Sequence, residues 1–184
     1  MDSKKTILLF SPTGNIGGAE INLITLCRNL CGVYNLIVVL PPEGKLKTKL
    51  SEFNLTLIFM PSKQLQSGGI FQVLWACTKL HFKLRKYKID LLHSNSRYCL
   101  YVPIYIGLLA KIPTLIHWAD YEIHAGDRSL IKWAKKRVTL IAVSKDIATH
   151  LINNGVQEQQ IEIIHNGTEI PPASEATRED IAHS

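Results

Sequence analysis

Short apolar segments alternate along the chain with longer segments in which apolar residues recur every three or four positions. The short segments are rich in Val, Ile, Leu and Thr, so we expect β-strands there. The predicted strands are Thr6–Phe10, Leu36–Leu40, Thr56–Met60, Leu91–His93, Thr114–Trp118, Leu140–Val143 and Ile161–Ile164. Such continuous apolar strands are typical of parallel sheets. We therefore expect an α/β fold: a Rossmann-like, doubly wound, mostly parallel sheet of about seven strands with helices on both faces.

The longer segments have the period of amphipathic helices. The predicted helices are Ala19–Cys31, Leu46–Phe53, Ile70–Tyr87, Tyr98–Ala110, Arg128–Arg137 and Lys145–Asn154. Ser144 is expected to cap the start of the last helix, and Gly155 to end it. Beyond Ile164 the sequence becomes polar and contains several turn-forming residues. We therefore expect one domain over residues 1–170, followed over 171–184 by a linker and the start of a further domain.

The composition is typical of a globular domain. The 184 residues, 46% of them hydrophobic and 20% charged, can bury a core, which excludes a disordered or collagen-like protein. The N-terminal residues do not resemble a secretory signal, and no apolar stretch approaches the ~20 residues of a membrane span, so we expect a cytoplasmic protein. Without a Cys-x-x-Cys pair, the cysteines predict buried free thiols and no metal site. They are Cys27, Cys31, Cys77 and Cys99.

The formal net charge of +6 favours anionic partners such as phosphates, acidic lipids or nucleic acid. A basic run around Trp133 could in principle contact nucleic acid. No helix-turn-helix, RNP-like aromatic pair or zinc finger accompanies it in the sequence. We therefore do not expect a nucleic-acid partner.

A glycine-containing loop, residues 11–20, follows the first predicted strand and opens a helix. Glycines allow backbone N–H groups to approach an anion, and a helix N-terminus favours negative charge, so Gly17 and Gly18 could cradle a diphosphate. Their spacing matches neither the dinucleotide fingerprint nor the P-loop, and a tight turn explains the loop equally well. Leu40 is followed by Pro41 rather than by an acidic residue, so the ribose ligand of an NAD site is absent.

Polar side chains gather where the fourth and fifth predicted strands end. His93, Ser94 and Asn95 close one strand, while His117 and, three residues later, Asp120 close the other. Ligands of open α/β sheets bind at this edge, which makes both groups candidates for a site. A single histidine is more often a structural residue, but two at neighbouring strand ends favour a site, and His117 is the stronger candidate.

The segment Ile70–Tyr87 carries a second signal on its helical wheel. One stripe predicts core residues: Ile70, Val73, Leu74, Cys77, Leu80, Leu84 and Tyr87. Beside it lie aromatic and basic residues that suit an anionic membrane surface or an acidic lipid acceptor: Phe71, Trp75, Lys79, Phe82, Lys83 and Lys86. A solvated basic face, with the aromatic rings packed under a neighbouring loop, is the open alternative.

Five short motifs connect these observations. They are Gly17–Glu20 before an amphipathic helix, Asp90–Ser94, Ile112–His117, Ile141–Ser144 and Ile163–Gly167. Their order and spacing resemble the N-terminal, acceptor-side domain of family 4 glycosyltransferases. The resemblance covers residues 6–167, nearly the whole chain.

The resemblance implies one half of a GT-B enzyme, in which a nucleotide-sugar donor lies between two Rossmann-like domains and no further cofactor is needed. It implies that Gly17, Gly18 and Glu20 lie near the donor diphosphate or the acceptor, and that His117 lies at the transferred sugar. The implied cleft-lining residues are His93, which supports the cleft floor, with Ser94, Asn95, Asp120 and Asn166.

The sequence departs from the family by lacking its pair of glutamates separated by seven residues, which belongs to the C-terminal, donor-binding half. We therefore expect a partner domain or partner chain, and little activity of this chain alone. The predicted function is glycosyl transfer from a nucleotide-sugar, with retention of the anomeric configuration. The predicted acceptor is a glycan or a lipid-linked sugar. We expect the reaction to serve polysaccharide or glycolipid biosynthesis at the cytoplasmic side of the membrane. The alternatives are a non-catalytic, membrane-recruiting subunit of a split transferase and a generic nucleotide-binding α/β enzyme.

Overall fold

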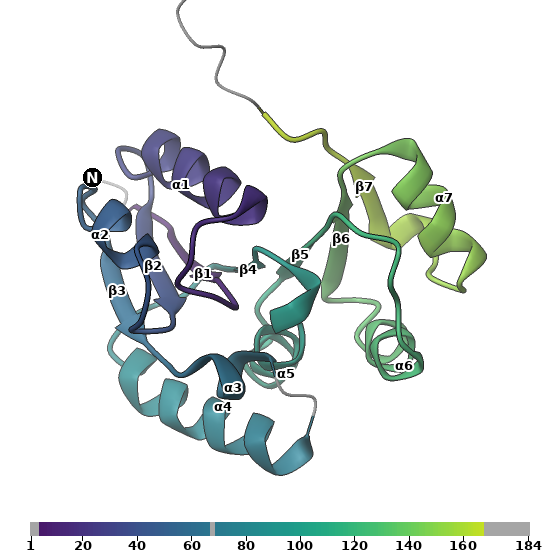
Figure 1. The fold of residues 1–184 in the computed structure, drawn as a ribbon. Coiled ribbons are helices and arrows are strands. Elements are labelled where there is room, and N and C mark those ends of the chain that lie inside the picture. The colour runs from purple at the N-terminus through teal and green to yellow at the C-terminus, as the bar shows by residue number, and fades with distance from the viewer. Residues whose placement is uncertain (1–3, 67–68, 168–184) are drawn as a thin grey trace, which may run out of the picture.

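The computed structural model describes residues 4–66 and 69–167. They form a single seven-stranded sheet, ordered β3-β2-β1-β4-β5-β6-β7, in which every neighbouring pair is parallel. The strands are β1 (Thr6–Phe10), β2 (Asn35–Leu40), β3 (Thr56–Phe59), β4 (Leu91–Ser94), β5 (Thr114–Trp118), β6 (Val138–Ala142) and β7 (Ile161–Ile163). Figure 1 shows the sheet with helices packed around it. The predicted fold class is confirmed.

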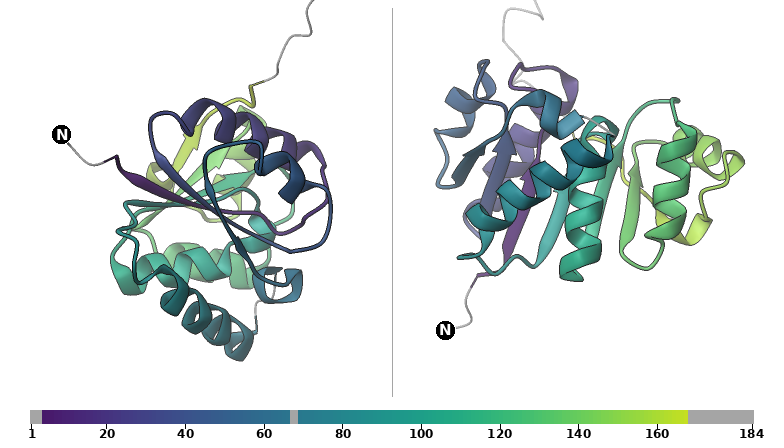
Figure 2. Two further views of the ribbon diagram at one scale, coloured as in Figure 1. Left: turned by 90° about the vertical axis from the view of Figure 1, so that its left-hand side faces the viewer. Right: turned by 90° about the horizontal axis from the view of Figure 1, so that it is seen from below.

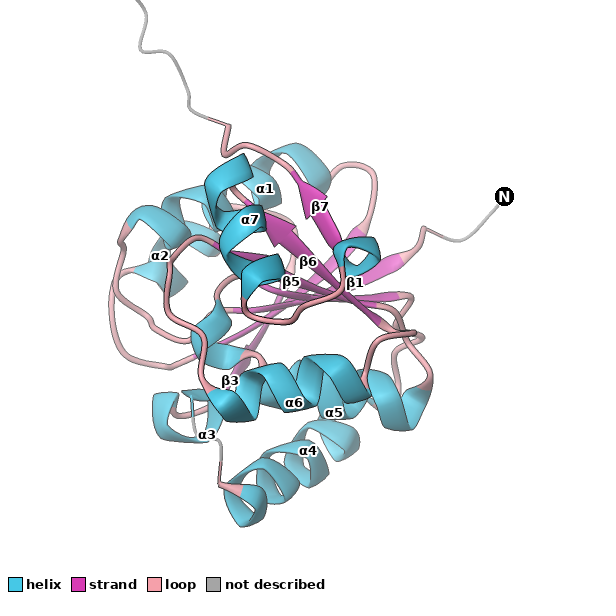
Figure 3. Cartoon of the chain, turned by 90° about the vertical axis from the view of Figure 1, so that its right-hand side faces the viewer, coloured by secondary structure: helices cyan, strands magenta, loops and turns pink. Residues whose placement is uncertain are grey.

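Helices cover both faces of the sheet (Figure 2). Over one face lie α1 (Gly18–Leu30) and α2 (Leu46–Leu50), whose Leu23, Cys27 and Leu46 pack on β1 and β2. The other helices are α3 (Ser62–Gln66), α4 (Ile70–Leu84), α5 (Tyr101–Ala110), α6 (Ala125–Trp133) and α7 (Lys145–Asn153). Figure 3 shows α4, α5 and α6 together below the sheet. Two 3₁₀ turns, Arg97–Cys99 and Glu158–Gln160, complete the described elements.

The helix ends differ from the prediction where side chains or backbone turns decide them. The helix expected at Arg128–Arg137 begins at Ala125, because the Asp127 carboxylate accepts a hydrogen bond from the backbone N–H of His124 at 3.0 Å and caps its first turn. It ends at Trp133. Four other expected helices are shorter than predicted. The helices α2, α4 and α7 end early, at Leu50, Leu84 and Asn153, and α5 begins only after the 3₁₀ turn. The short helix α3 was not expected.

The predicted caps of α7 are present. The Ser144 hydroxyl accepts a hydrogen bond from the N–H of Ile147 at 3.2 Å. Gly155 follows the helix at a φ of +87°, a conformation that glycine adopts without strain. All four cysteines are free, as expected, but Cys31 is half-buried rather than buried because it follows the last turn of α1.

None of the helices in the described ranges is long and apolar enough to cross a membrane. The predicted linker and start of a further domain at 171–184 lie outside the described residues. The domain expected over 1–170 is described as far as Gly167, and its predicted boundary stays a prediction.

Candidate functional site

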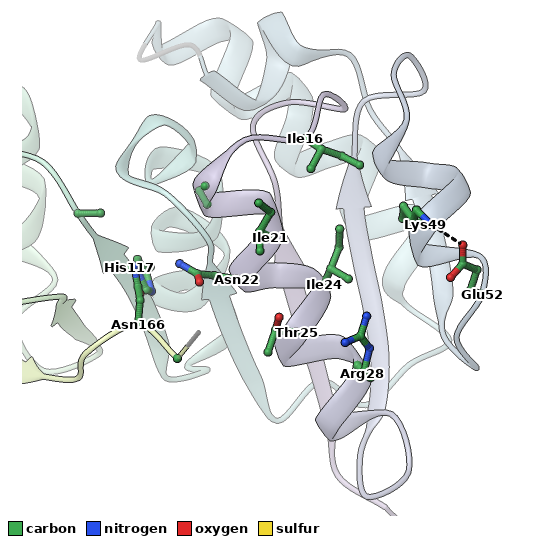
Figure 4. A pocket seen from close by; sticks show the side chains of 14 residues that line it. Ile16, Ile21, Asn22, Ile24, Thr25, Arg28, Lys49, Glu52, His117 and Asn166 are labelled. Atoms are coloured by element: carbon green, nitrogen blue, oxygen red, sulfur yellow. Dashed lines mark hydrogen bonds and ion pairs between the residues drawn. The ribbon is translucent and has the colours of Figure 1, made fainter. Parts of the chain in front are cut away.

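A cavity of roughly 750 Å³ opens at the carboxyl-terminal edge of the sheet. One wall is α1, which contributes Gly18, Asn22 and Thr25. Lys49 of α2 and Glu52 in the turn after α2 border the cavity. The opposite wall consists of the residues at the end of β5 and beyond β7: His117, Ala119, Asn166 and Gly167. Figure 4 shows His117 and Asn166 side by side across from α1. This position is where open parallel sheets bind their ligands.

The register of β4 and β5 places two histidines on the same face. His93 pairs with Leu9 on one side and with Leu115 on the other, and His117 lies two residues beyond Leu115. Because side chains alternate along a strand, His93 and His117 both project to the face covered by α1. Their ring centroids are 6.4 Å apart, with the ring planes tilted by 35°. His117 lines the cavity, and the buried His93 lies beside it.

Both imidazoles have a buried, unpaired nitrogen. Nε2 of His93 and Nε2 of His117 have no hydrogen-bond partner among the residues that the structure describes. Burial, reinforced by the neighbouring His117, lowers the pKa of His93 to about 4. Burial also lowers the pKa of His117, while the Asn166 side chain acts in the opposite direction. Both rings are therefore neutral near pH 7, so each retains one donor and one acceptor nitrogen. His117 lines the cavity, so a ligand there could pair with Nε2 once a rotation of the ring exposes this atom.

Glu20 stabilises the glycine loop. Its carboxylate accepts hydrogen bonds from the backbone N–H of Gly17 at 3.2 Å and from the Ser11 hydroxyl at 3.4 Å, and only 5% of the residue is exposed. A carboxylate in this first turn also interacts favourably with the helix dipole. Neither Glu20 nor Gly17 lines the cavity, so the structure gives Glu20 a capping contact instead of a place on the cavity wall.

Gly18 differs from the other glycines of the loop. A Cβ placed on Gly18 meets no atom within 4 Å, so packing does not require glycine at this position. By contrast, a Cβ on Gly14 would lie 1.6 Å from the carbonyl oxygen of Glu43. Gly18 lines the cavity at the first turn of α1, where unpaired backbone N–H groups favour an anion.

The remaining predicted residues have structural partners near the cavity. Ser94 donates a hydrogen bond to the carbonyl oxygen of Ser96 at 2.8 Å, and the Asn95 side-chain amide donates to the carbonyl oxygen of Ala19 at 2.9 Å. Asp120 accepts a hydrogen bond from Arg97 Nε at 2.6 Å. These contacts connect the loops after β4 and β5 with the start of α1. None of Ser94, Asn95 or Asp120 lines the cavity, whereas the predicted Asn166 does.

The sequence reasoning missed the polar side of α1. Asn22, Thr25 and Arg28 line the cavity at a spacing of three residues, which places them on one face of the helix. The sequence contains this three-residue spacing, which predicts a polar helix face. The spacing does not show that the face borders a cavity. Within the described ranges, no group of three or more His, Cys, Asp or Glu residues could hold a metal ion.

The structure corrects one part of the α4 prediction. Leu74, expected in the core, is 52% exposed, and Ala76 is buried in the helix's inner stripe instead. Phe71 is 85% exposed, so its ring is not covered by a loop. Lys79 Nζ lies 4.9 Å above the Trp75 ring. The Ile70 side chain lies outside the described part of the structure. We call the exposed side of α4, together with Lys86 in the turn after it, the aromatic face. Its residues are Phe71, Leu74, Trp75, Lys79, Phe82, Lys83 and Lys86.

The chain resembles solved glycosyltransferase structures. A glycosyltransferase from Rickettsia africae ESF-5 superposes with a TM-score of 0.79 at 20% identity, covering 98% of this chain and 49% of that chain. Anabaena HepE in complex with UDP and glucose gives a TM-score of 0.68 at 21% identity, covering 96% and 50%. MurG from Acinetobacter baumannii gives 0.58 at 16% identity, covering 78% and 42%. Among curated proteins, no sequence matches significantly.

This chain thus spans about half the length of the structures that it resembles. At these identities the superpositions show the fold, which is that of one half of a GT-B glycosyltransferase. The sequence itself matches Glycosyltransferase Family 4 over residues 16–170. The chain therefore belongs to glycosyltransferase family 4.

Proposed function

We propose that this chain is the acceptor-side half of a nucleotide-sugar-dependent glycosyltransferase. The observation that carries the proposal is the cavity at the carboxyl ends of the strands, where the unpaired Nε2 of His117 lies opposite the first turn of α1. A sugar diphosphate presents hydroxyl groups and negative charge, which match an imidazole and a helix N-terminus respectively. The cavity lies where a second domain could close over it.

The donor that we propose is a UDP-sugar, since the HepE structure contains UDP and glucose. Its diphosphate would approach the backbone of Gly18, where no side chain blocks access. Lys49 borders the same cavity but pairs with Glu52 at 3.3 Å, so its charge is partly compensated. The second half is therefore proposed to supply the main cations for the leaving diphosphate.

His117 is the proposed catalytic residue. In its neutral form, Nε2 can hydrogen-bond a hydroxyl of the transferred sugar or stabilise charge that develops near the breaking bond. The departing phosphate can take the acceptor proton, so the mechanism that we propose needs no protein base. We propose that the reaction retains the anomeric configuration. The acceptor is a glycan or lipid-linked sugar in polysaccharide or glycolipid biosynthesis, and the chain alone is inactive.

Release of UDP tests this proposal. The protein that combines this chain with its donor-binding half is mixed with UDP-sugars and candidate acceptors, and acceptor-dependent UDP release is measured. The 184-residue chain alone is the matched control and is expected to give no release above background. Equal release by both samples would contradict the proposed division of labour. Sugar binding without turnover in the combined protein would favour the non-catalytic alternative.

A peripheral contact with the cytoplasmic side of an anionic membrane is a second proposal, supported by the aromatic face of α4. Phe71, Trp75 and Phe82 are exposed on one side of this helix, and Lys79 and Lys83 accompany them. Exposed aromatics flanked by lysines are typical of helices that lie in a membrane interface. A protein that transfers sugar to a lipid-linked acceptor would need such a contact.

Vesicle co-sedimentation tests the membrane proposal. Binding is expected to rise with acidic lipid and to fall with salt, because exposed charges are screened over about 10 Å at 0.1 M ionic strength. The double variant Lys79→Glu/Lys83→Glu should lose most of this binding. Lys132→Glu/Lys135→Glu, with the same change of charge at exposed residues outside α4, is the control and should retain it. Equal sedimentation of both variants would contradict the proposal.

A further inference from the structure

A second hollow lies between α4 and α5, and we call it the α4–α5 pocket. It encloses roughly 230 Å³ and is lined mainly by apolar side chains, among them Leu8, Cys77 and Ile106. Ile89 and Ile112 also line it, and these residues precede β4 and β5 respectively. The pocket therefore lies at the amino-terminal edge of the sheet, opposite the edge that carries His117.

The lining of this pocket disfavours water and favours hydrocarbon. An ordered buried water needs two to four polar partners, which an apolar wall does not provide. Dry apolar cavities of only about 150 Å³ take up small hydrocarbons. The α4–α5 pocket is larger than that and is open to the surface, where Leu109 in its wall is 77% exposed. A flexible hydrocarbon chain can therefore enter from outside.

Positive charge accompanies the hollow at one end of α4. Arg85 lines the α4–α5 pocket and also a second hollow on the other side of the helix, against β3. Lys83 and Lys86 line that second hollow. In the described part of the chain, no carboxylate forms an ion pair with Arg85. The end of α4 thus offers three cations within four residues, which attract a phosphate group.

We propose that the α4–α5 pocket binds one acyl chain of an anionic phospholipid, with the lipid phosphate at Arg85. This inference rests on the proposed membrane contact, because the aromatic face of α4 would bring the pocket to the bilayer surface. An acyl chain matches the apolar lining, and an anionic headgroup matches Arg85 in the pocket wall, with Lys83 and Lys86 nearby in the second hollow. A bound chain would anchor the protein more firmly than surface charge alone.

Alkylation of Cys77 reports occupancy of the pocket, because this thiol is in its wall. The probe is monomeric dihexanoyl phosphatidylglycerol, kept below its micelle concentration so that no bilayer is present. N-ethylmaleimide labelling is followed peptide by peptide, with the half-buried Cys31 as the internal reference. We expect the lipid to slow labelling of Cys77 at least threefold and to leave Cys31 unchanged. An unchanged rate at Cys77 would overturn the proposal.

Two protein variants and a second lipid test separately how the acyl chain and the lipid headgroup contribute to binding. Ala110→Phe places a ring at the pocket wall and should abolish protection, whereas Ala125→Phe on α6 should not. Arg85→Glu keeps the pocket but reverses its rim charge, so protection by phosphatidylglycerol should fall at least threefold. Dihexanoyl phosphatidylcholine should protect wild type less well than phosphatidylglycerol. Equal protection in Ala110→Phe, or equal protection by both lipids, would contradict the assignment.

The vesicle and monomer experiments separate the two membrane proposals. Phe71→Ala/Trp75→Ala, at exposed residues that line neither hollow, should lose vesicle binding and still show protection of Cys77 by monomeric phosphatidylglycerol. If wild type binds no vesicles yet Cys77 is protected, the surface contact fails and the pocket stands. If vesicles bind through the aromatic face and Cys77 is never protected, the pocket assignment is wrong.

Discussion

His93 and His117 come from neighbouring strands and lie with ring centroids 6.4 Å apart, each with a buried Nε2 that no group in the described ranges satisfies. Buried polar atoms in native proteins almost always have a partner. The cavity beside His117 can supply one as a ligand, but the more deeply buried His93 has no such opening of its own among the described residues. The two histidines should therefore respond differently to substitution.

Replacing His117 should affect turnover much more than stability. In the protein that combines this chain with its proposed donor-binding half, we expect His117→Ala to lower turnover about 10²-fold, the size typical of a lost hydrogen bond to the transition state. The thermal midpoint should fall only modestly, because Nε2 has no partner to lose within the described structure and the ring gives up its contact with the Asn166 side chain. His124→Ala, at an exposed histidine outside the cavity, is the control. Normal turnover with a lower midpoint would show that His117 is structural.

Replacing His93 should change how stability depends on pH. Burial and the neighbouring His117 lower the pKa of His93 to about 4, below the value of about 6.5 for an unfolded chain. Between these values the unfolded state binds more protons, so the free energy of unfolding falls as pH decreases from about 6.5 towards 4. The shift corresponds to about 3 kcal/mol, at 1.36 kcal/mol per pKa unit.

Urea denaturation at pH 7 and pH 4.5 measures this effect. Between those values wild type should lose more unfolding free energy than His93→Gln, which has no titrating ring at this position. His124→Gln, with the exposed histidine replaced, should match wild type. Parallel curves for wild type and His93→Gln would contradict the low pKa of His93.

The fold was predictable because its strands are continuous apolar runs. β1 and β5 begin and end at the predicted residues, since Lys5 and Ser11 flank β1 and Pro113 precedes β5. The start of α6 was missed because a buried aspartate, Asp127, caps it in place of a typical N-cap side chain. Helix periodicity alone does not reveal such a contact.

The site was predictable only to the level of the sheet edge. Parallel topology brings His93 and His117 to that edge, but their shared face depends on the register of β4 and β5, which the sequence does not specify. The ion pair between Arg97 and Asp120 joins residues 23 positions apart and forms only through the tertiary fold. The sequence therefore predicts Asp120 on the cavity wall, whereas in the structure its carboxylate pairs with Arg97.

Asp120 should contribute more stability than Glu122 through the same arginine. The Arg97 side chain is only 4% exposed and contacts both carboxylates, but the Asp120 side chain is 36% exposed and that of Glu122 is 66% exposed. Solvent screens the more exposed pair more strongly. We expect Asp120→Ala to lower the free energy of unfolding by about 1–2 kcal/mol, and Glu122→Ala by about 0.5 kcal/mol or less. Equal losses in urea denaturation would contradict this ranking.

Two glycines of the same loop should have opposite effects when replaced by alanine. A Cβ on Gly14 would overlap the carbonyl oxygen of Glu43, so Gly14→Ala should lower the free energy of unfolding by at least about 2 kcal/mol. A Cβ on Gly18 meets nothing, and alanine favours the helix by up to about 1 kcal/mol, so Gly18→Ala should be at least as stable as wild type. Urea denaturation of the two variants measures both changes.

The effect of Gly18→Ala on donor affinity then isolates its functional role. The added methyl group would lie on the cavity wall, where we propose that the diphosphate approaches the backbone of α1. Isothermal titration of the protein that combines this chain with its proposed donor-binding half should show at least about tenfold weaker binding of UDP, a loss of about 1.4 kcal/mol. Asn29→Ala, further along α1 and outside the cavity wall, controls for general effects on the helix. If Gly18→Ala binds UDP as wild type does while remaining fully folded, the diphosphate does not lie against the first turn of α1.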